Sequence, residues 1–187
     1  EAWRIEIDCY PNLTKTGSYR GYNELIPPFY GSGHNKYGGS YSKKDVKDLI
    51  NYGKKLNIEI MPEIDLPAHS WTLLQVMPEL RDSESNIKSE DVGSYANNTI
   101  NPTMDETDQF LKNVFKELSE IFSFNIIHVG VDERPKESWK GSPKVREYMN
   151  NNNIASFEEF QDDYMNKLIK LLNNLNKRAA AWNEAAF

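Results

Sequence analysis

The stretch that decides the fold is Asn-Ile-Ile-His-Val-Gly-Val-Asp-Glu, residues 125–133. Residues 125–131 form a short and almost continuous apolar run, which is typical of a strand buried on both faces of a parallel sheet. Two acids, Asp132 and Glu133, follow directly where the run ends. The stretch therefore predicts a buried parallel strand with a polar site at its carboxyl end.

Helical patterns alternate with short apolar runs on either side of this strand. The predicted helix starts, most with capping-box spacing, are Ser42 with Asp45, Thr103 with Glu106, Ser142-Pro143, and Ser156 with Glu159. Two more strands are predicted at residues 58–62 and 178–182. The apolar stripes expected on the helices are Val46, Leu49, Ile50, Gly53 and Leu56; Leu111, Val114, Phe115, Leu118 and Ile121; and Phe160, Tyr164, Leu168, Leu171 and Leu175.

The alternation of strand and helix predicts an α/β fold, with a parallel sheet covered by helices. No glycine-rich phosphate fingerprint follows any of the strands, which argues against an open nucleotide-binding sheet. We therefore expect part of a (β/α)8 barrel of the TIM type. The sequence contains no repeat and no linker, so residues 1–187 are expected to form one partial barrel domain.

The composition narrows the classes of function. The net charge is -6 and the Lys and Arg residues are scattered, which argues against a nucleic-acid or anionic-membrane partner and fits a neutral substrate. No apolar run reaches the roughly 18 to 20 residues of a membrane span. Cys9 is the single cysteine, so an intrachain disulfide is impossible, and its apolar surroundings predict a packing role.

Polar residues gather at the ends of three predicted strands. The first runs into Pro-Glu-Ile-Asp-Leu-Pro-Ala-His at residues 62–69, the second carries His128 and ends in Asp132-Glu133, and the third ends in Trp-Asn-Glu at residues 182–184. Parallel strands place these ends side by side. Acids on one rim suit glycoside cleavage, in which one acid protonates the leaving oxygen and a second group stabilises or attacks the developing cation.

The adjacency of Asp132 and Glu133 limits the mechanism. Neighbours at one strand end are poorly placed to flank a glycosidic bond from opposite faces. The spacing therefore favours a mechanism in which the substrate itself supplies the nucleophile, one of the exceptions to the use of two carboxylates.

Four segments, in the right order, resemble glycoside hydrolase family 20, the β-N-acetylhexosaminidases and chitobiases. Residues 1–20 are similar to the segment after the second barrel strand of that family, and residues 62–69 to its Pro-Glu-(Ile/Phe)-Asp-x-Pro-(Gly/Ala)-His motif. Residues 128–133 match His-x-Gly-x-Asp-Glu, and residues 182–184 resemble Trp-(Asp/Asn)-Glu. The resemblance implies a catalytic-domain fragment that runs from the end of the second barrel strand to the fifth.

The resemblance also implies an activity: hydrolysis of terminal, non-reducing β-linked N-acetylglucosamine or N-acetylgalactosamine, from oligosaccharides or glycoconjugates, with retention. Glu133 would be the general acid/base, Asp132 would orient the acetamido nitrogen, and His69 would tune the proton of Glu133. Trp182 would form one wall of the pocket around the acetamido methyl group. The other expected substrate-binding residues are Asp65, His128 and Glu184. No metal or organic cofactor is implied, and an exported or lysosomal location would follow from the family.

Other interpretations stay open. A metal-dependent hydrolase is one, although no compact His-x-His or His-Glu-x-x-His motif occurs; the residues of zinc or manganese ligand type are Asp65, His69, His128, Asp132 and Glu133. A catalytically incomplete fragment with a structural or sugar-binding role is another, because part of a barrel leaves two sheet edges unpaired. A core role for His128 and a structural role for Glu63 and Asp65 are also compatible with the pattern.

Overall fold

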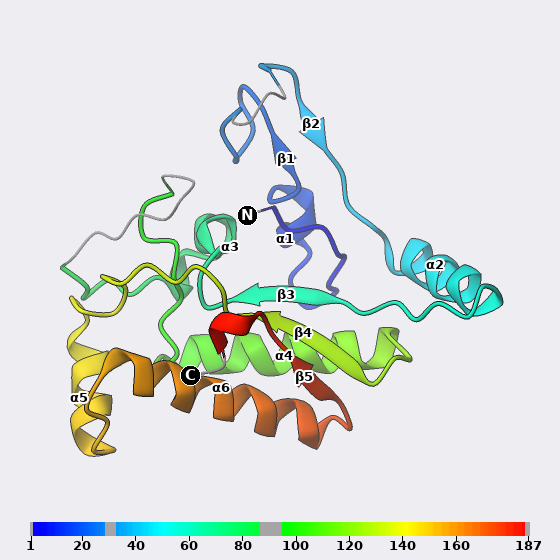
Figure 1. Cartoon of the computed structure of the whole chain (residues 1–187). Helices are drawn as coiled ribbons and strands as arrows, with labels where there is room; N and C mark the ends of the chain where they lie inside the picture. The colour runs from blue at the N-terminus through cyan, green and yellow to red at the C-terminus, as the bar shows by residue number, and fades with distance from the viewer. Residues whose placement is uncertain (1, 29–32, 87–94, 186–187) are drawn as a thin grey trace.

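The computed structural model describes residues 2–28, 33–86 and 95–185. At its centre, β3 (Glu63–Leu66), β4 (Ile126–Gly130) and β5 (Arg178–Ala180) form a parallel sheet in that order (Figure 1). The helix α4 (Asp105–Ile121) connects β3 to β4, and α6 (Phe157–Asn174) connects β4 to β5. The predicted α/β class with parallel strands and helical crossovers is confirmed.

The other elements surround this sheet. They are α1 (Asn12–Lys15), β1 (Tyr19–Arg20), β2 (Tyr37–Gly38), α2 (Lys43–Lys55), α3 (Trp71–Val76), η1 (Pro78–Leu80), α5 (Pro143–Asn151) and η2 (Asn183–Ala185). The strands β1 and β2 pair in antiparallel fashion and project away from the central sheet (Figure 1). Among the described residues, no helix combines the length and the apolar character that crossing a membrane requires.

Alternation along β4 separates the two faces of the sheet. Ile127 and Val129 are fully buried in the core, together with Leu118 of α4 and Leu168 of α6. His128 lies between Ile127 and Val129, so its side chain points to the opposite face. The face that turns away from α4 and α6 is therefore the one that carries the polar side chains.

The predicted stripes of α4 and α6 are confirmed. The buried members that pack in the core beneath the sheet are Leu111, Val114, Phe115 and Leu118 on α4, and Tyr164 and Leu168 on α6. Phe160, at the start of α6, is buried in a second cluster with Trp139, Val145 and Met149. The members nearest the helix ends are only partly buried: Ile121, Leu171 and Leu175. Burial of each large apolar side chain contributes roughly 1.5–3 kcal/mol, so these two stripes hold the helices on the sheet.

The prediction for α2 is right about its start and wrong about two members of its stripe. Ser42 and Asp45 form the reciprocal capping box, and Val46 is buried. Leu49 and Leu56, however, are 44% and 52% exposed. The reason is position: α2 lies at the periphery, beyond the amino end of β3 (Figure 1), so only a narrow strip of its surface meets the core.

The strand predicted at residues 58–62 is misplaced, because β3 comprises Glu63–Leu66. Ile58 and Met61 are 52% and 44% exposed. An apolar run does not determine which of its residues pair with a neighbouring strand. Pairing with β4 starts only where Glu63 lies opposite His128. The predicted strand at residues 178–182 is confirmed in part, as Arg178–Ala180.

The predicted capping box of α4 is wrong as well. The helix begins at Asp105 after Met104, which provides no side-chain cap. The Thr103 hydroxyl instead donates to Oδ1 of Asn101, at 2.7 Å. Because the helix starts one residue later than the box requires, Thr103 is not its N-cap and Glu106 is not its third residue.

The other two helix starts are confirmed. The hydroxyl of Ser142 accepts from the Val145 N–H at the start of α5, and that of Ser156 accepts from Glu159 N–H at the start of α6.

Cys9 is exposed, which corrects the prediction that it packs in the core. It lies in a turn, where its thiol donates to Oε2 of Glu117 at 3.2 Å. Partial burial and this carboxylate raise the pKa of Cys9 to about 11. The thiol therefore stays protonated at neutral pH and is a poor nucleophile.

Candidate active site

The backbone after β4 turns sharply and brings two successive acids to the same rim. Gly130, Val131 and Glu133 have φ angles of 72°, 78° and 50°. A positive φ is unusual for a β-branched residue such as Val131, and strained backbone of this kind concentrates at functional sites. In extended backbone the side chains of Asp132 and Glu133 would point in opposite directions. The left-handed conformations of Val131 and Glu133 remove that restriction.

His69 is the centre of the polar cluster. Its Nε2 lies 3.4 Å from Oε2 of Glu133 and 3.8 Å from Oδ2 of Asp132. The same nitrogen lies 3.8 Å from Oδ2 of Asp65. The loops after β3 and β4 thus bring the three residues predicted to be catalytic together with Asp65.

Asp65 holds a proton more tightly than an ordinary aspartate. Burial is the main cause, and the neighbouring carboxylates of Asp132 and Glu63 add to it, whereas His69 acts in the opposite direction. Together they raise the pKa of Asp65 from 3.8 to about 7. Protonated Asp65 can donate a hydrogen bond to Asp132, and this bond also raises the pKa of Asp65.

A second group of side chains lies on the same face of the sheet, around Glu63. Trp182, after β5, donates its indole Nε1–H to Oε1 of Glu63 at 2.9 Å. Nδ1 of His128 lies 3.2 Å from the same oxygen. The rings of His128 and Trp182 meet edge to face, with centroids 4.9 Å apart. Three strands therefore contribute to one small network.

The predicted substrate-binding residues differ in their surroundings. His128 is only 7% exposed, whereas Trp182 is 49% exposed and presents its ring to the open face. Glu184 lies in η2; within residues 2–28, 33–86 and 95–185 no hydrogen bond or ion pair joins it to the network or to the cluster around His69. Sequence reasoning did not count Glu63 as a site residue. Its spacing of two from Asp65 places both on the same sheet face, and that signal was available.

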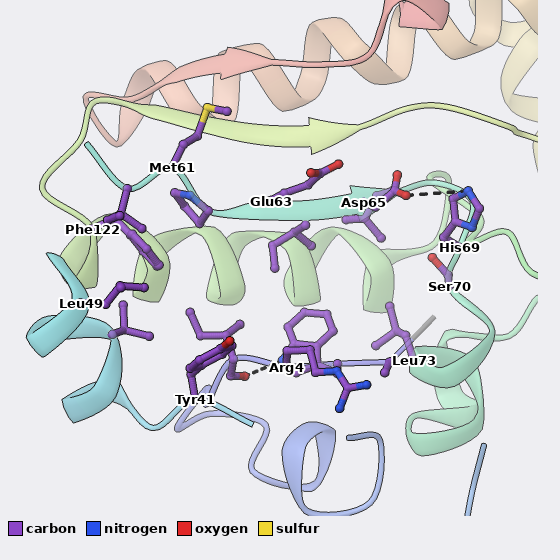
Figure 2. A pocket seen from close by; sticks show the side chains of 18 residues that line it. Arg4, Tyr41, Leu49, Met61, Glu63, Asp65, His69, Ser70, Leu73 and Phe122 are labelled. Atoms are coloured by element: carbon purple, nitrogen blue, oxygen red, sulfur yellow. Dashed lines mark hydrogen bonds and ion pairs between the residues drawn. The ribbon is translucent and has the colours of Figure 1, made fainter. Parts of the chain in front are cut away.

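The cavity that runs along β3 lies beside the acidic cluster rather than at it. It has a volume of about 370 Å³, with Asp65 and His69 at one end and Leu49 and Phe122 at the other (Figure 2). Most of its lining is apolar, and neither Asp132 nor Glu133 borders it. The hydroxyl groups of a sugar would remain unpaired against such a lining, so we do not assign the substrate to this cavity.

The site also contains a set of atoms of metal-ligand type. Asp65, His69 and Asp132 each offer one such atom, all within 4.8 Å of one another. An imidazole nitrogen with two carboxylate oxygens suits zinc or manganese chemically. The same residues suit proton transfer, so the donor set by itself does not separate a metal site from an acid–base site.

A parallel β/α sheet with a histidine and three acids at its carboxyl rim is the arrangement expected of part of a β/α barrel with a polar site at the carboxyl ends of its strands. The chain belongs to glycosyl hydrolase family 20: the model of that family's catalytic domain matches residues 1–186. The resemblance noted in the sequence and the barrel class are thereby confirmed.

Known relatives agree with this assignment. A β-hexosaminidase of Vibrio furnissii is 34% identical over 186 residues, which are 99% of this chain and 30% of that protein. The human β-hexosaminidase subunit beta is 29% identical over 145 residues, 77% of this chain and 26% of that protein. The chain therefore spans less than a third of the length of these relatives.

Solved structures show the same arrangement. The exo-β-N-acetylglucosaminidase of Vibrio harveyi, in complex with N-acetylglucosamine, superposes with a TM-score of 0.94 at 32% identity. The match covers 99% of this chain and 29% of that chain. A chitobiase of Flavobacterium johnsoniae superposes with a TM-score of 0.79 at 24% identity, over 100% of this chain and 26% of that chain, which supports the fold alone.

Proposed function

We propose that the protein carrying this chain hydrolyses terminal, non-reducing β-linked N-acetylhexosamine residues of oligosaccharides or glycoconjugates, with retention of configuration. Membership of family 20 supports this proposal. So do the relatives named β-hexosaminidase and the Vibrio harveyi enzyme, whose structure contains N-acetylglucosamine. The net charge of -6 is compatible with a neutral sugar as substrate.

The observation that carries the proposal is the approach of two adjacent acids to one histidine. Glu133 and Asp132 lie 3.4 Å and 3.8 Å from Nε2 of His69. Glu133, with its carboxyl half exposed, is the one placed to reach a glycosidic oxygen. Asp132 is more enclosed and is suited to hold a substrate N–H group. This division of roles matches a substrate-assisted reaction better than a pair of opposed carboxylates.

In the proposed reaction, Glu133 gives its proton to the leaving oxygen as the glycosidic bond breaks. The acetamido carbonyl oxygen of the substrate attacks the anomeric carbon at the same time and forms a cyclic oxazolinium ion. Asp132 accepts a hydrogen bond from the acetamido N–H, which orients the carbonyl and stabilises the positive charge. Glu133 then takes a proton from water, which attacks the anomeric carbon, reopens the ring and gives the retained configuration.

The remaining predicted residues are assigned around this centre. Trp182 is proposed to form a wall for the acetamido methyl group, because its exposed ring lies on the same sheet face as the acids. Protonated Asp65 is proposed to hold Asp132 in place by donating a hydrogen bond to it. His128 is proposed to support the Trp182 ring through their edge-to-face contact. Glu184 is proposed to contact the sugar from η2.

The direct test uses a chromogenic N-acetyl-β-glucosaminide and the matching β-glucoside, in which a hydroxyl replaces the acetamido group. The protein that carries this chain should cleave the first and not the second. Cleavage of both at similar rates would rule out substrate assistance. Assays of the 187-residue chain by itself separate a self-sufficient unit from a catalytically incomplete fragment.

A metal-dependent hydrolase is tested separately. Elemental analysis of the purified protein, before and after chelation, reports whether Asp65, His69 and Asp132 hold an ion. The proposal expects chelation to leave turnover unchanged. A stoichiometric ion that is lost on chelation together with the activity would contradict the proposed mechanism.

A further inference from the structure

One carboxylate oxygen, Oε1 of Glu63, lies close to two ring nitrogens, one on β4 and one just after β5. The indole Nε1 of Trp182 lies 2.9 Å away and Nδ1 of His128 lies 3.2 Å away. The pairing of Glu63 with His128 in the β3–β4 register accounts for the second contact. The first is not a consequence of register, because Trp182 follows the end of β5.

We propose that Glu63 is a positioning residue that fixes the orientation of the Trp182 indole as a wall of the acetamide site. This inference rests on the proposed function. Glu63 itself does not touch the reacting atoms. It acts through Trp182, and the geometry of that wall decides which acyl groups the site accepts.

Trp182 needs such a restraint because little else confines its ring. It is 49% exposed and lies between the short strand β5 and the single turn of η2. The bond to Glu63 fixes the indole N–H edge, and a hydrogen bond to a charged acceptor is about twice as strong as one between neutral groups. The edge-to-face contact with His128, with ring planes 65° apart, fixes the tilt. Two restraints from two strands define both side-chain torsions.

A purely structural role explains Glu63 less well. Its side chain is 41% exposed and faces the acidic cluster, where its charge helps to raise the pKa of Asp65. Like charges placed together lower stability. Within the described part of the chain no Lys or Arg forms an ion pair with Glu63; its partners are the two site rings. A glutamate that is electrostatically unfavourable but hydrogen-bonded to Trp182 is better explained by positioning.

The variants that test this are Glu63→Ala, which removes the acceptor, and Glu63→Gln, which keeps an oxygen of the same reach. Glu63→Asp is the second variant should Glu63→Ala fail to fold, because it withdraws the carboxylate by one methylene and retains the charge. Glu59→Ala is the matched control, since Glu59 is an exposed glutamate in the segment that leads into β3. Thermal unfolding confirms that each variant is folded.

The first measurement is independent of activity. In protein labelled with ¹⁵N-tryptophan, the Nε1–H resonance of Trp182 is assigned by its loss in Trp182→Phe. Glu63→Ala should shift this resonance, Glu63→Gln should restore most of the shift, and Glu59→Ala should leave it in place. A Trp182 resonance that Glu63→Ala does not move overturns the proposal.

The second measurement is the acyl selectivity of hydrolysis. We expect Glu63→Ala to lower kcat by up to about 100-fold on the N-acetyl substrate, because the acetamido oxygen is no longer held in line. The preference for N-acetyl over N-propionyl substrate should fall as well, and Glu63→Gln should recover both. In the Trp182→Phe background, which has no N–H donor, Glu63→Ala should add almost no further loss. Fully additive losses, or an unchanged acyl preference, overturn the positioning role.

The two proposals fail in different ways. Wild-type protein that does not cleave the N-acetyl substrate refutes the proposed function, whatever the Trp182 resonance shows. If the wild-type protein is active, but Glu63→Ala changes neither the acyl selectivity nor the Trp182 resonance, the positioning role alone is refuted.

Discussion

Gly130 of β4 faces Asp65 of β3 so closely that a Cβ on Gly130 would overlap with the Oδ1 atom of Asp65. The backbone of Gly130 also has a φ of 72°, a region that residues with side chains rarely adopt. The space that a side chain would fill is thus occupied by the Asp65 carboxyl group, whose pKa the neighbouring Asp132 helps to raise. Glycine at this position is a condition for the acidic cluster to form.

Gly130→Ala should therefore damage both fold and site. The strained φ and the overlap with Asp65 together are expected to lower the free energy of unfolding by roughly 2–4 kcal/mol. Unfolding in urea measures this change in the free energy of unfolding. The control is Gly39→Ala, because a Cβ on Gly39 meets no atom within 4 Å. Equal effects at the two positions would contradict the close approach of Gly130 and Asp65.

Glu133→Gln should reduce turnover of an N-acetyl-β-glucosaminide by roughly 10²- to 10⁴-fold, because the amide cannot donate the proton that the leaving oxygen requires. Steady-state kinetics on the protein carrying this chain give the result. Glu137→Gln, an exposed acid in the same loop, should be without effect. Unchanged activity of Glu133→Gln would remove Glu133 from the role of acid/base.

Asp65 should make the stability of the protein depend on pH. Its pKa is raised to about 7 in the folded state, so between its ordinary value of 3.8 and that value the folded state binds more protons than the unfolded state. The free energy of unfolding therefore falls as the pH rises through this window, with a slope from this group of at most about 1.4 kcal/mol per pH unit.

Asp65→Asn isolates this contribution, because an amide resembles the protonated acid and does not titrate. Denaturant unfolding of both proteins from pH 4 to 8 gives the difference in stability, wild type minus variant. We expect this difference to fall as the pH rises and to level off above about 7. A difference that grows with pH would mean that His69 stabilises the Asp65 anion more than burial opposes it.

Elements with a strong local signal could be predicted from the sequence. The apolar run of β4 and the serine caps of α2, α5 and α6 depend on residues that are near one another in the chain. The position of β3 could not be predicted in this way, because the partner strand decides which residues pair.

The proximity of the acids to the histidine could be predicted from the sequence, whereas the contacts around them could not. His69, Asp132 and Glu133 belong to segments whose residue types already indicate chemistry. The role proposed for Glu63 depends on Trp182, which lies 119 positions away in the chain. The left-handed backbone at Val131 was also beyond sequence reasoning, since a β-branched residue argues against a positive φ.

The two predicted capping boxes at α2 and α4 provide a last test, because the structure retains only the first. At α2 the hydroxyl of Ser42 accepts from Asp45 N–H at 3.1 Å, and the Asp45 carboxylate accepts from the Ser42 N–H at 2.9 Å. Ser42→Ala should lower the free energy of unfolding by about 1 kcal/mol, since an N–H at the helix start loses its acceptor. Glu106→Ala, at the box that does not form, should cost only a few tenths of a kcal/mol through the helix dipole. Chemical denaturation of both variants gives the change in the free energy of unfolding. A decrease at Glu106 as large as that at Ser42 would mean that α4 begins with a reciprocal cap after all.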